Sequence, residues 1–122
     1  EIDLSGLVNL KVLSLGCNKL TEIDLSELVN LIELRIGGNM LTEIDLNRLD
    51  SLKRLNLSNN QLTEIDLGEL VNLKVLYLKY NILDVDYIIK MISENENILP
   101  KLYHFDLFID EYKKLRDHIN YH

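Results

Sequence analysis

The 122-residue chain has a formal net charge of −7, is 47% hydrophobic and contains one Pro and one Cys. This composition predicts one folded domain over residues 1–122, without a disordered tract or a membrane-spanning segment. The acidic balance and the lack of a basic stripe argue against nucleic acid or an anionic membrane as the main partner.

The hexapeptide LTEIDL occurs three times, at residues 20–25, 41–46 and 62–67, so its copies start 21 residues apart. Its tail EIDL also opens the chain, so we expect a partial repeat over residues 1–9 and regular repeats over residues 10–83. A complete unit reads LKVLSLGCNKLTEIDLSELVN, from residue 10 to residue 30. The period and the pattern L-x-x-L-x-L-x-x-N-x-L resemble the leucine-rich repeat family.

The first half of each unit predicts a short strand. In LKVLSL, Leu13 and Leu15 alternate with Val12 and Ser14, which is the period of a half-buried strand. One unit cannot bury its apolar side alone, but stacked units can. We therefore expect an α/β solenoid with a parallel β-sheet, and the resemblance implies a curved right-handed coil with this sheet on its concave face.

An asparagine follows each predicted strand, where the chain has to turn inward. A buried turn leaves backbone N–H and C=O groups unpaired, at a cost of about 1–3 kcal/mol for each group. An amide side chain donates and accepts at once, so a ladder of such side chains satisfies successive turns. We expect a structural role, rather than a binding or catalytic one, for Asn18, Asn39, Asn60 and Asn81.

The second half of each unit predicts an extended arm that turns Ile23 and Leu25 into the core and leaves Glu22 and Asp24 outside. Stacking then aligns the acidic residues of successive units in two columns. These columns are Glu22, Glu43 and Glu64, and Asp24, Asp45 and Asp66. Three interpretations stay open: duplicated residues that have not diverged, an acidic ridge for a basic partner, and metal binding between carboxylates.

The pattern changes after residue 83, and residues 84–109 predict a longer final repeat that contains a helix of about ten residues. The candidates for the caps of this helix are Asp84, Asp86, Asn95 and Asn97. A last strand follows, and residues 110–122 predict an amphipathic capping helix. The stretch is similar to the helix-bearing repeats of the ribonuclease-inhibitor type and to the C-terminal cap of intracellular leucine-rich repeat proteins.

Candidate catalytic groups are few. Cys17 has no neighbouring base, because all three histidines lie near the C-terminus, and we expect it to be a filler residue. His118 and His122 are spaced i, i+4 but lack a third ligand. We expect no enzymatic activity, no cofactor and no metal.

The exposed strand positions predict the binding surface. Unlike the copied TEID residues, these positions differ from repeat to repeat, and the resemblance implies that they form the binding face. We expect a protein or peptide partner there. The candidate contact residues are Glu33, Arg35, Arg54, Tyr77, Lys79, Tyr80, His104, Asp106 and Phe108.

Aromatic residues favour the C-terminal half of this face, because all eight lie at or after residue 77. Aromatic residues and arginines dominate the energetics of many protein interfaces. Arg35, Arg54 and Lys79 add positive charge to an acidic chain, so we expect the partner to present an acidic stretch.

The predicted function is a monomeric, non-enzymatic protein-interaction module, an adaptor or recognition domain. The alternative is a structural or spacer segment of a larger surface or secreted effector protein. The lone cysteine excludes an internal disulfide and favours a reducing compartment, so we expect a cytoplasmic location. A surface or secreted location stays open, because the chain begins in mid-repeat without a Met.

Overall fold

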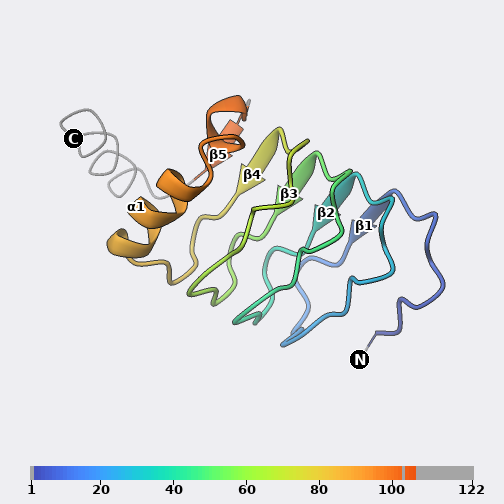
Figure 1. Ribbon diagram of the computed structural model, residues 1–122. Helices are drawn as coiled ribbons and strands as arrows, with labels where there is room; N and C mark the ends of the chain where they lie inside the picture. The colour runs from blue at the N-terminus through green and yellow to red at the C-terminus, as the bar shows by residue number, and fades with distance from the viewer. Residues whose placement is uncertain (1, 103, 107–122) are drawn as a thin grey trace.

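The computed structural model describes residues 2–102 and 104–106, which wind through successive coils with one short strand each (Figure 1). The strands are β1 (Val12–Ser14), β2 (Glu33–Arg35), β3 (Arg54–Asn56), β4 (Val75–Tyr77) and β5 (His104–Asp106). The helices are α1 (Val85–Glu94) and the 3-10 helix η1 (Leu99–Lys101). The capping helix predicted over residues 110–122 lies outside the described residues.

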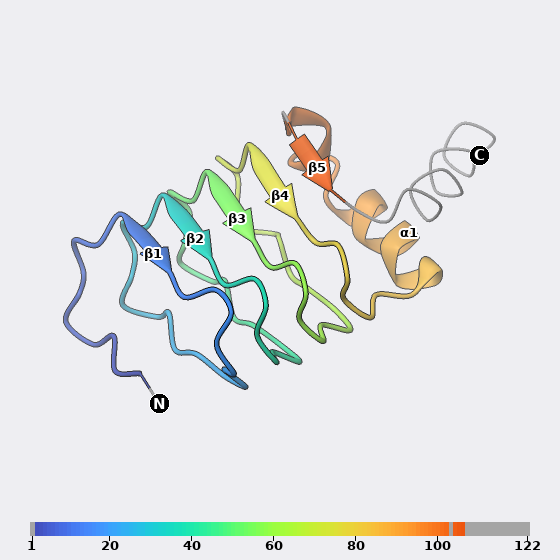
Figure 2. The ribbon, with the colours of Figure 1, turned by 180° about the vertical axis from the view of Figure 1, so that it is seen from behind.

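The five strands form one parallel sheet in chain order, and Figure 2 shows them side by side. Neighbouring strands pair with a shift of one repeat, so that Leu13 lies opposite Leu34 and Leu34 opposite Leu55. Hydrogen bonds extend this pairing beyond the strands, since the Leu15 N–H donates to the Arg35 carbonyl at 2.8 Å. The solenoid with a parallel sheet that the sequence predicts is confirmed.

Columns of leucine fill the inside of the coils. Leu34 and Leu55 in the strands, and Leu28 in the turn between coils, have no exposed surface. Leu7 occupies the position of Leu28 in the first coil, and it is 44% exposed. Each leucine is therefore buried by the neighbouring coils as well as by its own, as expected for stacked repeats.

The asparagine side chains connect successive coils. The Asn60 amide donates to the carbonyl oxygens of Ile36 at 3.0 Å and Leu57 at 3.1 Å, and its Oδ1 accepts from the Leu41 N–H at 3.1 Å. Ile36 and Leu41 belong to the preceding coil, and Leu57 to the coil of Asn60 itself. Equivalent hydrogen bonds are made by Asn39 and Asn81.

Replacing Asn60 with Ala is expected to lower the free energy of unfolding by about 1–3 kcal/mol, because buried backbone groups of two coils lose their partner. Asn18→Ala is the matched control. Asn18 is exposed and, within the described part of the chain, bonds to Leu15 and Gly16 of its own coil, so its loss should cost about 0.5 kcal/mol or less. Urea denaturation measures both variants, and equal midpoints would contradict the ladder.

The aspartates of the extended arms close a turn in each coil. Asp24 Oδ1 accepts a hydrogen bond from the Ser26 N–H at 2.9 Å, an arrangement typical of Asp in turns. The same bond is made by Asp3, Asp45 and Asp66. The aspartate column therefore has a local structural function that none of the three interpretations from sequence included.

The glutamate column differs from the aspartate column. Among the described residues, no hydrogen bond or ion pair reaches the side chains of Glu22, Glu43 and Glu64, and all three are exposed. Nothing in this part of the molecule requires a glutamate at these positions for folding.

Acidification is expected to weaken the turn at Asp24. Hydrogen bonds from the Ser26 hydroxyl, and then from the Ser26 backbone N–H, lower the pKa of Asp24 below its ordinary value. The carboxylate therefore stabilises the fold above about pH 3.9, the ordinary pKa of Asp, and this contribution is lost as the pH falls through the lowered pKa.

Asp24→Asn keeps an acceptor oxygen but does not titrate, so it tests this effect. Its melting temperature should fall less steeply on acidification than that of the unmodified chain, as measured by circular dichroism at a series of pH values. If the melting temperatures of the variant and the unmodified chain fall in parallel with pH, the Asp24 turn does not contribute to acid sensitivity.

The helix α1 replaces the extended arm in the last coil. The Asp84 side chain caps its start by accepting from the Tyr87 N–H at 2.7 Å, and Asn95 forms its C-cap. Ile88 and Met91 are buried against the leucine core. The ten-residue helix predicted from the sequence is confirmed, and these contacts select Asp84 and Asn95 among the candidate caps.

Candidate protein-binding face

The outward side chains of the strands form a continuous surface, which we call the sheet face. In each of the first four strands the central residue is buried and the flanking residues are partly or fully exposed. Because the strands pair in register, equivalent residues align in columns. The described side chains of this face are Val12, Ser14, Glu33, Arg35, Arg54, Asn56, Val75, Tyr77 and His104.

A hollow of about 400 Å³ lies in the sheet face. It brings together five of the nine contact residues predicted from the sequence, namely Glu33, Arg35, Arg54, Tyr77 and His104. Asn56 and Val75 also line it. Sequence reasoning left these two out of the site, although their strand positions place them in the same columns and could have identified them.

Two arginines share one carboxylate in this hollow. Arg35 Nη2 lies 3.1 Å from Glu33 Oε2, and Arg54 Nη1 lies 3.9 Å from Glu33 Oε1. The side chains of Arg35 and Arg54 are 57% and 65% exposed, whereas that of Glu33 is 16% exposed. The guanidinium groups therefore outnumber the carboxylate, and they are the more exposed groups of the three.

An aromatic pair lies beside the charged group. The rings of Tyr77 and His104 have centroids 5.0 Å apart and are tilted by 47°. Tyr77 comes from β4 and His104 from β5, so the two rings are positioned by adjacent strands. Aromatic rings at this distance and tilt stabilise each other and so restrain the orientation of both side chains.

The other predicted contact residues do not line the hollow. Lys79 is half-buried just beyond β4, and Tyr80 lies in the turn that follows, with 53% of its surface exposed. The side chain of Asp106, and Phe108 as a whole, lie outside the described residues.

The turn that holds Tyr80 has a left-handed backbone, and so do the equivalent turns of the three preceding coils. The φ angles are 59° at Cys17, 74° at Gly38, 57° at Asn59 and 64° at Tyr80. Glycine adopts this conformation without strain, whereas a non-glycine residue there costs about 1–3 kcal/mol. At Gly38 a Cβ atom would also lie 3.2 Å from the Cys17 nitrogen, so this coil favours glycine on two grounds.

Two further observations concern residues 2–102 and 104–106. No three His, Cys, Asp or Glu side chains in these ranges gather in a way that could hold a metal ion. No helix there is long and apolar enough to cross a bilayer.

Four parallel strands that recur every 21 residues, three of them followed by an asparagine that bridges adjacent coils, define a solenoid repeat protein with a sheet on one side. A family model described as "Leucine Rich repeats (2 copies)" matches residues 8–48 and 50–90, more than half of the chain. The chain belongs to the leucine-rich repeat family, as its motifs predict.

Among solved structures, the chain is similar to the functional domain of InlJ from Listeria monocytogenes, which includes a cysteine ladder. The two are 28% identical, with a TM-score of 0.70, and the match covers 88% of this chain and 27% of that one. This chain thus spans about a quarter of the length of the InlJ domain. No curated protein sequence matches it. Leucine-rich repeat domains generally mediate protein–protein interactions and are generally non-enzymatic.

Proposed function

We propose that the chain is a non-enzymatic interaction module, an adaptor or recognition domain, that binds a protein partner through the sheet face. The observation that carries this proposal is the hollow in which Tyr77 and His104 lie beside the Arg35–Glu33–Arg54 group. Tyrosine and arginine are the residue types that most often dominate interface energies, and they do so in concave, partly desolvated places.

Rigidity supports the same proposal. Every residue of the hollow comes from a strand of the sheet, and a partner therefore orders few additional side chains when it binds. Binding costs about 0.5–1.5 kcal/mol for each long side chain that becomes immobilised. The ring contact of Tyr77 with His104 and the ion pairs of Glu33 reduce this cost in advance.

The charges favour an acidic stretch of the partner. The chain as a whole carries a net charge of −7, but its sheet face exposes the guanidinium groups of Arg35 and Arg54. Lys79 and Tyr80, which follow β4, remain part of the proposed face, as do Asp106 and Phe108 on the evidence of the sequence pattern alone. Complementary charges of this kind speed up association and orient the partner.

The proposal includes a monomer in a cytoplasmic location, supported by the free and exposed thiol of Cys17. The second candidate is a spacer segment of a larger surface or secreted protein, supported by the 27% coverage of the InlJ domain. A spacer would need no individualised sheet face, and the variation of strand residues from coil to coil therefore favours the interaction module.

Tyr77→Ala is expected to weaken partner binding by about 2 kcal/mol or more, roughly thirtyfold in affinity, because it removes the largest ring of the hollow. The partner would first be captured by the immobilised chain and identified, and its affinity then measured by calorimetry. Ser14→Ala, at the other end of the same column, is the matched control and should bind like the unmodified chain. Unchanged affinity of Tyr77→Ala, with its fold intact, would refute the proposed site.

A further inference from the structure

A second hollow lies on a different side of the coils from the sheet face. It has a volume of about 800 Å³ and is bounded by the extended arms of three coils and by α1. The arms contribute Ile23, Ile44 and Ile65 from equivalent positions of successive repeats. Because these three residues occupy the same place in the motif TEIDL, the hollow presents the same backbone three times.

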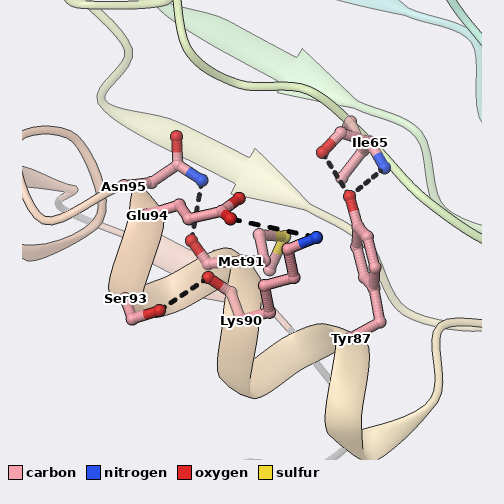
Figure 3. A network of polar contacts seen from close by, with 7 residues as sticks. All are labelled: Ile65, Tyr87, Lys90, Met91, Ser93, Glu94 and Asn95. Atoms are coloured by element: carbon pink, nitrogen blue, oxygen red, sulfur yellow. Dashed lines mark hydrogen bonds and ion pairs between the residues drawn. The ribbon is translucent and has the colours of Figure 1, made fainter.

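The backbone of one of these three isoleucines, Ile65, is hydrogen-bonded to a hydroxyl group of the chain itself. The Tyr87 hydroxyl of α1 accepts a hydrogen bond from the Ile65 N–H at 2.7 Å and donates one to the Ile65 carbonyl at 2.6 Å (Figure 3). A hydroxyl suits this place because it donates and accepts through one atom. The side chain of Tyr87 therefore shows which chemical group the arm backbone binds.

The other two positions are free of such a partner. Within the described ranges, no hydrogen bond reaches the backbone N–H or carbonyl of Ile44 or Ile23. Both residues are half-buried and line the hollow. Two copies of the site that holds the Tyr87 hydroxyl are thus open towards the same space.

The charge around these two positions is negative. Six carboxylate side chains and one lysine, Lys90, line the hollow among the described residues. Lys90 lies 3.9 Å from Glu94 of the same helix (Figure 3), whereas Glu22 and Glu43 have no ion pair in this part of the molecule. A group that enters beside Ile23 and Ile44 therefore gains from positive charge.

We propose that this hollow binds a basic amphipathic helix of a protein partner through two tyrosine side chains. The hydroxyl of each tyrosine accepts a hydrogen bond from the N–H of Ile44 or Ile23 and donates one to its carbonyl, as the Tyr87 hydroxyl does at Ile65. Basic residues of the same helix meet the glutamate column. This second surface is separate from the sheet face and does not depend on the function proposed for it.

The spacing of the coils specifies the arrangement of the two tyrosines. The paired strands of adjacent coils lie about 4.8 Å apart, which sets the scale of the spacing between their arms, and side chains at i and i+4 of a helix lie about 5–6 Å apart. A helix with tyrosines four residues apart thus matches two adjacent arms. The helix α1, which bounds this hollow, supplies one tyrosine hydroxyl to one arm, and the partner helix supplies two hydroxyls to the other two arms.

The test uses two synthetic lysine-rich helical peptides that differ only in the hydroxyl groups. One carries two tyrosines at i and i+4, and the other carries phenylalanines at the same positions. Fluorescence anisotropy with the whole chain should give an affinity at least about tenfold higher for the tyrosine peptide. In NMR spectra, the amides of Ile44 and Ile23 should shift with the tyrosine peptide and much less with the phenylalanine peptide.

Charge variants separate this site from the sheet face. Glu43→Gln should weaken the tyrosine peptide about fourfold, whereas Glu96→Gln, which removes the same charge outside the hollow, should not. Tyr77→Ala should leave binding of the tyrosine peptide unchanged. The proposal for this hollow can therefore fail while the proposal for the sheet face holds, and the reverse. Equal affinities for the two peptides, or amide shifts confined to the sheet face, would overturn the proposal.

Discussion

The hydrogen bonds that join one coil to the next are the constraint on which this molecule depends. Asn39 donates to the Ile36 carbonyl of its own coil and to the Leu15 carbonyl of the preceding coil, so it fixes the position of one turn relative to the next. Turns fixed in this way help to hold the strands in register, and register aligns their outward residues in columns. The hollow of the sheet face therefore follows from backbone groups that must be paired inside the turns.

Features set by the period could be predicted from the sequence, whereas features set by local bending or by a single contact outside the repeat pattern could not. The parallel sheet and the leucine core follow from the alternation of apolar residues. The turn bond of Asp24 depends on a bend of two residues, which the alternation does not specify. The contact of Tyr87 with Ile65 joins residues 22 positions apart, and no pattern within α1 indicates where its hydroxyl lies.

The same distinction applies to the sheet face. Strand alternation was sufficient to select Glu33, Arg35, Arg54, Tyr77 and His104, because β-strands turn alternate residues outward. It was not sufficient for Tyr80, which the left-handed turn carries beyond the strand. The copied arms and the varied strands also differ in kind: the varied strands give one individual surface, whereas the copied arms offer one chemical environment several times.

The packing of leucines between coils bears on how the molecule comes apart. Leu28, which has a coil on each side, has no exposed surface, so opening an inner coil breaks contacts with two neighbours. A nearest-neighbour array unfolds one coil at a time or in groups, according to how strongly each interface couples its coils. Asn39, Asn60 and Asn81 each bridge two adjacent coils and so contribute to that coupling, together with the leucines buried between the coils. Cooperativity is therefore a property of the side chains between the coils.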